Sequence, residues 1–445
     1  MTSLSSQPYK GTRDYYPSDK RVQNYIFSVW KTVAERHGYE EYGAPLLEPL
    51  EVYTAKSGQE LAGEQTYAFT DRGERTVAIR PEMTPSVSRM VAARRQELGY
   101  PARLYSIANF MRYERPQRGR EREFWQCNVD VFGADGVYAD AEIISLAYEM
   151  VKAFGAKDDM FAIKVNDRRV IDAMMREYLE LDAVQSHMMI KLFDRKAKIP
   201  AEAFRDQAAE IAGEKAHEVL PKIATIITAQ SIEELPQELH EVEAVAELRQ
   251  LFELLRSAGV KNAMFDSTLM RGFDYYTGMV FEAFDAHPDN NRSMFGGGRY
   301  DGLVGLFGVE SVPTVGMAPG LTTTQLFLEA HGLLPKLSST TDVGIVVLGE
   351  ESLPGALQLA RTLRDEGVNA EVDITARKLD KQIKAVVKKQ VPFMIFVGED
   401  EVKHELYILK DVALQTEEKL GAERIISRVK DYRRASDDEL AELFE

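Results

Sequence analysis

The sequence of 445 residues contains one cysteine, Cys127, and only seven histidines, which are scattered along the chain. A single cysteine excludes an internal disulfide framework and any zinc site built from several cysteines. Since no two histidines have the spacing of metal ligands, we expect no metal held by histidine and cysteine side chains, and no zinc. So little cysteine also fits a reducing compartment, and we expect a cytoplasmic protein.

Long apolar segments are missing too. Residues 1–10 lack the apolar core of a secretory signal, and no uninterrupted apolar run is long enough to span a bilayer. Hydrophobic residues make up 44% and charged residues 28% of the chain, which is typical of globular proteins. We therefore expect no membrane partner, and the length predicts more than one domain.

An excess of positive charge is absent as well. The chain has 55 Lys and Arg against 71 Asp and Glu, a formal net charge of −16. Proteins that bind nucleic acid usually show a basic surface, so any RNA binding here depends on local basic segments. Two such segments exist, residues 112–122 with five arginines and residues 377–389 with six basic residues. For the second segment, an RNA-backbone contact and a solvated helix face are equally good interpretations.

The spacing of apolar and turn residues predicts the local structure of the N-terminal region. Apolar residues recur at helical intervals over residues 22–33, with Ser18 as a candidate cap and Gly38 as a stop. Thr84 before Pro85 is typical of an N-cap and first helical position. We expect a helix at each place.

The composition also predicts the domain organisation. We expect a catalytic domain over residues 1–334, carrying a helical insertion at 167–260 that is rich in Ala, Glu, Leu and Lys. A Pro/Ser/Thr-rich stretch at 335–341 indicates a linker, and residues 342–445 form an α/β domain. The strands expected outside the hairpin described below are residues 279–284, 343–348, 368–372 and 393–397, and the expected C-terminal helices are residues 353–364 and 377–389.

Residues 103–132 carry the most informative pattern. They alternate like two antiparallel strands joined by an arginine-rich loop. On the second strand a period of two places Gln126, Asn128 and Asp130 on one face. For an average strand that face is solvated, but guanidinium groups in the loop are suited to phosphate, so the hairpin favours a polyphosphate site over a solvated charge run.

Three further segments contain candidate site residues. Glu82, just before a helix, either receives an amine or interacts with the helix dipole, and the second role is favoured. Tyr275 and Tyr276 suggest a polar pocket wall, because buried hydroxyls need partners, although a surface turn remains an alternative. The glycine run at 296–298 matches neither a P-loop nor a dinucleotide fingerprint, and fits a flexible loop or a binding floor equally well.

Taken in order, these segments resemble the histidyl-tRNA synthetases, a family of class II enzymes, along almost the whole chain. Residues 10–14 (Lys-Gly-Thr-Arg-Asp) resemble the N-terminal signature, and residues 40–48 resemble motif 1, which lies at the dimer interface in that class. Residues 110–126 are similar to motif 2, and residues 271–282 and 296–301 resemble two segments particular to this family.

The resemblance implies an α+β catalytic domain with a mainly antiparallel sheet, a helical insertion and a C-terminal α/β domain of the anticodon-binding type. It implies a ligase that activates L-histidine with ATP, accompanied by Mg²⁺, to histidyl-adenylate and transfers it to tRNA(His). No organic cofactor is implied. A homodimer follows from motif 1.

The resemblance also implies residue roles. Those implied to bind histidine are Glu82, Thr84, Arg112, Gln126, Asp130, Arg271, Tyr275 and Tyr276. Those implied to bind ATP are Arg112, Glu114, Arg120 and Arg271. Arg112 and Arg271 flank the α-phosphate as catalytic residues, and Arg115 and Gln117 meet the tRNA acceptor end. Asp130 stands where many relatives carry glutamate.

Motif 3 departs from the family pattern. After Leu321 the family usually has Glu-Arg, and this chain has Thr322 and Thr323. The missing arginine normally helps to clamp ATP, so either the charge comes from elsewhere or catalysis is lost. The alternative is then a non-catalytic regulatory protein like the regulatory subunit of ATP phosphoribosyltransferase. The retained Arg112 and Arg271, with the C-terminal domain, favour the enzyme, and the imidazole-pocket residues argue against another amino acid.

Overall fold

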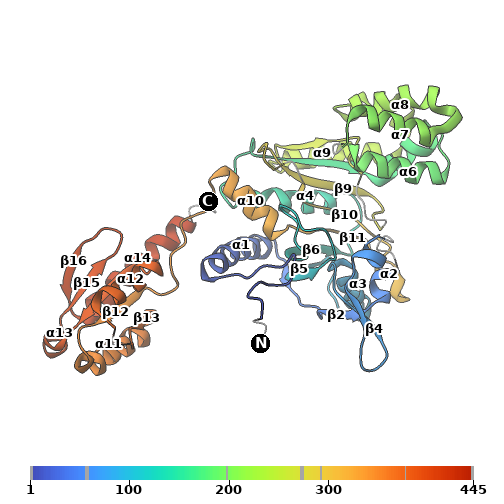
Figure 1. Cartoon of the computed structure of the whole chain (residues 1–445). Coiled ribbons are helices and arrows are strands. Elements are labelled where there is room, and N and C mark those ends of the chain that lie inside the picture. The colour runs from blue at the N-terminus through green and yellow to red at the C-terminus, as the bar shows by residue number, and fades with distance from the viewer. Residues whose placement is uncertain are drawn as a thin grey trace. The chain divides into compact units, whose positions relative to one another are not determined.

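The computed structural model describes residues 4–55, 60–196, 199–270, 275–290, 293–375 and 377–441. The chain forms two compact units, Met1–Leu334 and Pro335–Glu445 (Figure 1). Each unit has its own sheet, and each is considered by itself below.

Unit 1 is built on an eight-stranded sheet in the order β1-β5-β6-β11-β10-β9-β7-β8. Its strands are β1 (Glu40–Glu41), β5 (Ala102–Met111), β6 (Glu123–Phe132), β7 (Phe161–Asp167), β8 (Ala263–Phe265), β9 (Met279–Asp285), β10 (Ser293–Arg299) and β11 (Thr314–Met317). Within this sheet, only the two edge pairs, β1 with β5 and β7 with β8, are parallel among the described strands. The mainly antiparallel sheet expected from the sequence is therefore confirmed, as is the long hairpin β5–β6.

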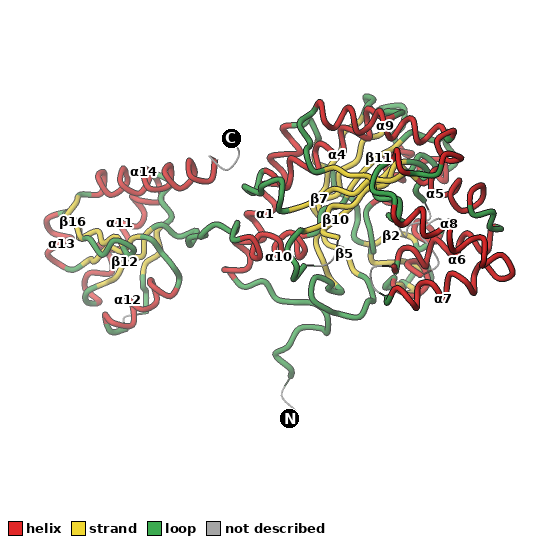
Figure 2. The backbone as a smooth tube through the Cα atoms, turned by 90° about the horizontal axis from the view of Figure 1, so that it is seen from above, coloured by secondary structure: helices red, strands yellow, loops and turns green. Residues whose placement is uncertain are grey.

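Helices cover this sheet (Figure 2). The helices α4 (Val137–Lys152) and α10 (Leu321–His331) pack against central strands of this sheet, and α1 (Pro17–Arg36) packs against both of these helices. Trp30 of α1 is fully buried, as are Cys127, Val129 and Val131, which alternate with the polar residues of β6. Because apolar side chains fill one face of β6, its polar residues are left to line a site on the other face.

Two helix starts differ from the prediction. The helix α1 begins at Pro17 with Tyr16 as its N-cap, so Ser18 lies inside the first turn. Proline is favoured at the first helical position because its φ is already helical and its missing N–H is not needed there. Likewise Met83 is the N-cap of α3 (Thr84–Ala93), and Thr84 is its first residue. A smaller sheet, β2 (Leu47–Pro49), β4 (Thr76–Ile79) and β3 (Ala68–Thr70), and the short α2 (Glu51–Thr54) complete this region.

A group of helices separates β7 from β8. They are α5 (Arg168–Ala173), α6 (Ala183–Asp194), α7 (Ala201–Ala212), α8 (Ala216–Thr228) and α9 (Glu243–Ser257). Short helical turns also occur in the unit: η1 (Glu60–Gln65), η2 (Met174–Tyr178), η4 (Gly213–Lys215), η5 (Ile232–Glu234), η6 (Gln237–Glu241) and η7 (Val304–Phe307). The helical character expected for residues 167–260 is thus present, inserted between two paired strands.

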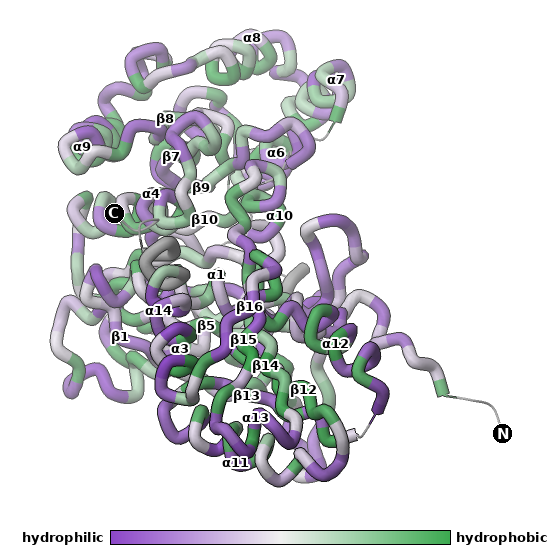
Figure 3. Tube along the Cα trace, turned by 90° about the vertical axis from the view of Figure 1, so that its left-hand side faces the viewer, coloured by the Kyte–Doolittle hydropathy of each residue, from purple (hydrophilic) through white to green (hydrophobic). Residues whose placement is uncertain are grey.

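Unit 2 has a five-stranded sheet in the order β13-β12-β14-β15-β16. Its strands are β12 (Val343–Val347), β13 (Ala370–Val372), β14 (Phe393–Val397), β15 (Tyr407–Asp411) and β16 (Glu417–Leu420), and its helices are η8 (Glu350–Ser352), α11 (Leu353–Asp365), α12 (Leu379–Lys388), α13 (Glu399–His404) and α14 (Ala422–Ala441). Figure 3 shows hydrophobic residues along β12 and β14, which are buried strands. The predicted strands and helices of this unit are confirmed; β15, β16, α13 and α14 were not predicted.

Candidate active site

The sheet of unit 1 carries a pocket of about 470 Å³ on the polar face of β6. Its wall comes from β6, β9, β10 and β11, from the start of α3 and from the tyrosine pair before β9. Nine predicted site residues line this pocket: Glu82, Thr84, Arg112, Glu114, Arg120, Gln126, Asp130, Tyr275 and Tyr276. Segments that are far apart in the sequence, from Glu82 to Tyr276, therefore converge on one cavity.

The other predicted site residues lie elsewhere. Arg271 is outside the described residues. Arg115 is not among the residues that line the pocket, and Gln117 lines a neighbouring one. Both belong to the exposed loop between β5 and β6.

The pocket includes polar residues that the sequence did not single out for the site: Gln65, Asn128, Glu282, Ser293 and Tyr300. Strand alternation places Asn128 beside Gln126 and Asp130, so its position was available from the pattern. Gln65 had no such indication, because it reaches the site through pairing of Thr66 with Arg112 and a bond from Tyr113 N to Gln65 O (2.7 Å).

At one end of the pocket Asp130 is a buried acid, with only 3% of its surface exposed. Burial raises its pKa to about 7, against the opposing effect of a short hydrogen bond that Tyr300 donates to its Oδ1. Its Oδ2 has no hydrogen-bond partner within the described part of the chain. An unsatisfied buried acceptor is costly, so this oxygen is suited to an N–H donor of a ligand. A Cβ at Gly316 would overlap Asp130 Oδ1, so β11 needs glycine there.

Tyrosines form the wall beside Asp130. The hydroxyl of Tyr275 donates to Glu82 Oε2 (3.1 Å), and its ring centroid lies 4.9 Å from that of Tyr276 and 5.7 Å from that of Tyr300. A Cβ at Gly298 would come within 2.8 Å of the Tyr276 ring. The glycine run is therefore part of a packed strand that lets the ring approach, and the flexible-loop alternative is wrong.

Guanidinium groups line the pocket toward the loop end of the β5–β6 hairpin, where Met111 pairs with Glu123, whereas Asp130 pairs with Leu104 farther along the strands. Arg112 donates from Nε to the carbonyl of Pro81 (2.8 Å) and lies over the Phe124 ring at 5.1 Å. Arg120 forms an ion pair with Glu114. These contacts fix the two guanidinium groups at the rim of one cavity. The two groups are therefore not freely solvated surface charges.

Arg122 has a different role from its neighbours in the loop. Its guanidinium lies 4.1 Å from the ring centroid of Tyr113 and donates to the carbonyl of Glu114 (3.2 Å). Arg112 and Arg120 thus line the pocket, whereas Arg122 stabilises the loop itself.

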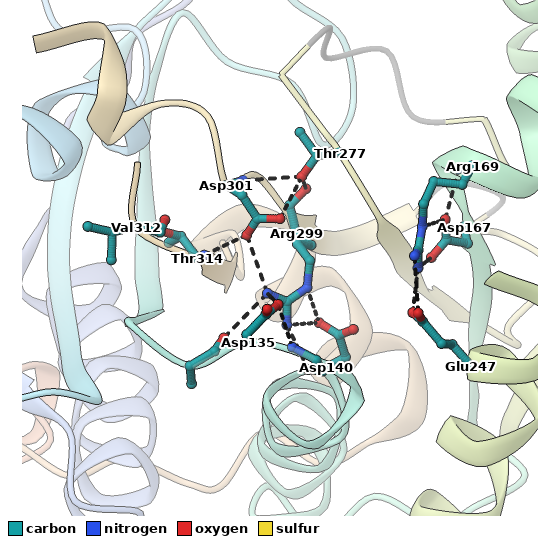
Figure 4. Close-up of polar contacts among 12 residues, drawn as sticks. Asp135, Asp140, Asp167, Arg169, Glu247, Thr277, Arg299, Asp301, Val312 and Thr314 are labelled. Carbon is teal, nitrogen blue, oxygen red and sulfur yellow. Dashed lines mark hydrogen bonds and ion pairs between the residues drawn. The ribbon is translucent and has the colours of Figure 1, made fainter. Parts of the chain in front are cut away.

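A buried ionic network supports the tyrosine wall (Figure 4). Arg299, at the end of β10, donates to Asp140 Oδ1 from Nη2 (2.7 Å) and to Asp301 Oδ1 from Nη1 (3.3 Å). The same Asp301 accepts from Thr314 N (2.8 Å) and from Thr277 Oγ1 (3.1 Å). This network joins α4, β10 and β11 to Thr277, the residue that follows Tyr276.

The described residues contain no group of three or more His, Cys, Asp or Glu side chains placed to hold a metal ion. None of their helices is both long and apolar enough to cross a bilayer.

Comparison with known proteins places this geometry in a family. The sequence model of the histidyl-tRNA synthetases matches residues 11–323, and that of the anticodon binding domain matches residues 342–432. The chain belongs to the histidyl-tRNA synthetase family. It is therefore an aminoacyl-tRNA synthetase by family, as the sequence predicted.

Relatives match over nearly their whole length. The histidine–tRNA ligase of Leptospira biflexa (strain Patoc 1 / Ames) is 41% identical over 431 residues, which cover 96% of this chain and 98% of that protein. The histidine–tRNA ligase of Haloarcula marismortui is 36% identical over 408 residues, covering 91% and 93%. Both units therefore have counterparts in this synthetase family.

Solved structures agree on the fold. Histidyl-tRNA synthetase from Nostoc sp. PCC 7120 superposes with a TM-score of 0.80 at 25% identity, covering 97% of this chain and 100% of the other. A Bacillus halodurans protein described as an ATP phosphoribosyltransferase regulatory subunit/histidyl-tRNA synthetase superposes with a TM-score of 0.72 at 23% identity, covering 89% of this chain and 99% of the other. The second likeness shows a shared fold alone.

Proposed function

We propose that this chain activates L-histidine with ATP to give histidyl-adenylate and pyrophosphate, and then transfers the histidyl group to tRNA(His). The observation that carries the proposal is one pocket with a buried hydrogen-bond acceptor at one end and guanidinium groups at the other. Such a pocket fits an amino acid with an N–H in its side chain next to a nucleotide.

Histidine occupies the end with Asp130. The unpartnered Oδ2 of Asp130 accepts an imidazole N–H, and Tyr276 contacts the ring with Tyr275 beside it. The α-amino group lies among Glu82, Thr84 and Gln126, where a carboxylate balances its charge. The amino acid is thus recognised at both ends, and its carboxylate is directed toward the arginines.

ATP occupies the end with Arg112, where Glu114 and Arg120 contact the nucleotide. A carboxylate oxygen of histidine attacks the α-phosphorus in line, a new O–P bond forms, and the bond to pyrophosphate breaks. Negative charge grows on the α-phosphate oxygens, so fixed positive groups stabilise the transition state. Arg112 and Arg271 provide that charge, and holding both substrates together removes much of the entropic barrier. Mg²⁺ enters as part of the ATP substrate.

The tRNA contacts both units. Arg115 and Gln117, in the exposed β5–β6 loop, meet the acceptor end, whose terminal hydroxyl attacks the mixed anhydride and releases AMP. On α12 the exposed Lys381, Lys384 and Lys388 remain available for phosphates. Two of their neighbours are less available, because Arg377 pairs with Asp373 (2.5 Å) and Lys389 with Glu371 (2.7 Å).

The organisation follows the family. Residues 1–334 are the catalytic domain with the insertion at 167–260, residues 335–341 the linker, and residues 342–445 the anticodon-binding domain. The enzyme works in the cytoplasm as a homodimer through motif 1, where Leu46 and Leu47 are each 46% exposed and offer apolar surface to a partner.

ATP–pyrophosphate exchange with each amino acid added separately tests the proposal. We expect exchange with histidine alone, and a loss of about 100-fold or more in Arg112→Ala, since one preorganised donor at a developing oxyanion contributes on that order. Folded protein that binds histidine but catalyses no exchange would favour the non-catalytic regulatory alternative.

A further inference from the structure

A second pocket, of about 300 Å³, adjoins the proposed active site. The two pockets share Ser293 and Met294, at the start of β10. The wall of the second pocket comes from the tip of the β5–β6 loop at residues 117–119, from the connection after β9, and from Thr323 and Leu326 of α10. A ligand in the main pocket that extends past Ser293 therefore enters this space.

Thr323 supplies no charge to that space. Its hydroxyl donates to the carbonyl of Met294 (2.7 Å) and also lies 3.1 Å from the carbonyl of Gly320, which places it in the first turn of α10. The position at which relatives have the motif 3 arginine is thus occupied by a short neutral side chain with a structural role. Any positive charge in this pocket comes from another lining residue.

Arg118 is the cation among the residues that line the second pocket. Arg118 donates one long hydrogen bond, from Nη2 to the neutral Asn290 Oδ1 (3.3 Å), and no carboxylate pairs with it in the described part of the chain. Arg120 differs, because it is held by Glu114. Most of the five guanidinium N–H donors of Arg118 are left for a ligand.

The surroundings aim Arg118 at the pocket. Asn290 donates from Nδ2 to Asp285 Oδ2 (2.6 Å), which fixes the amide so that its oxygen faces Arg118. The other oxygen of Asp285 contacts His331 Nε2 and accepts from His287 N, both at 2.7 Å. Both oxygens of this buried acid are occupied by these groups, and it forms no ion pair with Arg118. Asp289, the other acid that lines the pocket, has its Oδ2 4.0 Å from His287 Nδ1.

We propose that Arg118 contacts the outer phosphates of bound ATP and supplies the charge that Thr323 lacks. This inference rests on the proposed function, since it assigns a further residue to the ATP of that reaction. The ligand class is a nucleoside polyphosphate, recognised by the planar fork of donors that matches phosphate oxygens.

The test compares the full-length protein with three variants: Arg118→Ala, the double variant Arg118→Ala/Thr323→Arg, and Arg72→Ala. Arg72 is an exposed arginine in the turn between β3 and β4 and serves as the control. Equilibrium binding of ATP, pyrophosphate and adenosine is measured by calorimetry, and the KM values for ATP and histidine by pyrophosphate exchange.

We expect Arg118→Ala to weaken ATP and pyrophosphate binding about tenfold, which corresponds to about 1.4 kcal/mol for one charge-assisted contact. Adenosine binding and the KM for histidine stay unchanged, Thr323→Arg restores most of the ATP affinity, and Arg72→Ala has no effect. Unchanged ATP binding in Arg118→Ala, or weaker binding of adenosine alone, would overturn the inference. Wild-type protein that binds ATP through Arg118 without histidine-dependent exchange would instead contradict the proposed function.

Discussion

At the scale of single residues, Asp130 shows how a functional group costs stability. Its buried carboxyl keeps one oxygen without a partner, and burial raises its pKa from 3.8 to about 7. At pH values between these two pKa values, the folded protein therefore keeps a proton on Asp130 that the unfolded chain has lost. Stability falls as the pH rises through that window, by up to ~4 kcal/mol at 1.36 kcal/mol per pKa unit.

Asp130→Asn tests this cost. The amide keeps the shape and does not ionise, so we expect the variant to gain stability relative to wild type as the pH rises from 5 to 8, by about 2 kcal/mol or more. Histidine-dependent exchange falls in the same variant, because the amide has one accepting oxygen instead of two, and Tyr300 already donates to one oxygen at this position. Thermal unfolding from pH 5 to 8 is the measurement, and a stability difference that does not change with pH would show that Asp130 carries no such cost.

At the scale of secondary structure elements, the Arg299 network explains how the tyrosine wall stays in place. Arg299 is 6% exposed and joins the end of β10 to Asp140 on α4 and, through Asp301, to Thr277. Breaking a buried ion pair costs several kcal/mol, because a charge remains without its partner. Since Tyr276 and Tyr300 are direct neighbours of this network in the chain, its geometry sets theirs.

The substitution Arg299→Lys keeps the positive charge but removes the planar guanidinium group with its fixed N–H donors. We expect it to destabilise the protein by about 2 kcal/mol and to raise the KM for histidine several-fold, with little change in the KM for ATP. Arg75→Ala, which removes an exposed pair with Asp71 in the β3–β4 turn, is the control and costs under about 1 kcal/mol. Equal changes in both KM values would mean that the network supports the fold and not the histidine pocket.

The sequence predicted these elements well where the pattern is local. Alternation along β6 identified the face with Gln126 and Asp130, because a strand has a strict period of two. It did not predict Gln65 or the bond from Tyr275 to Glu82, because both depend on pairings between segments far apart in the chain. The N-cap predicted for α1 was wrong, because Pro17 at the first helical position determines where the helix begins.

At the scale of the whole molecule, the two units carry different sets of candidate functional residues. Unit 1 contains every described residue of the proposed active site, and unit 2 carries the exposed lysines of α12. With a net charge of −16 the chain as a whole repels RNA, so a local basic face must guide the contact. We therefore expect the contact of α12 with tRNA to be separable by mutation from the activation of histidine.

The variant Lys381→Glu/Lys384→Glu/Lys388→Glu tests that separation. We expect the KM for tRNA in aminoacylation to rise about tenfold or more, because phosphate contacts are lost, while pyrophosphate exchange stays unchanged. The matched control, Lys336→Glu/Lys403→Glu/Lys419→Glu, carries the same change of charge on exposed lysines away from α12. Equal effects of the two triple variants would show that net charge, and not the α12 face, governs tRNA binding.

The most direct test of the central claim is aminoacylation of a tRNA(His) transcript with labelled histidine by the purified protein. We expect label on the tRNA that depends on both ATP and histidine, and that is lost in Arg112→Ala. A folded protein that transfers no histidine to tRNA(His), while a histidyl-tRNA synthetase of established activity charges the same transcript, would contradict it.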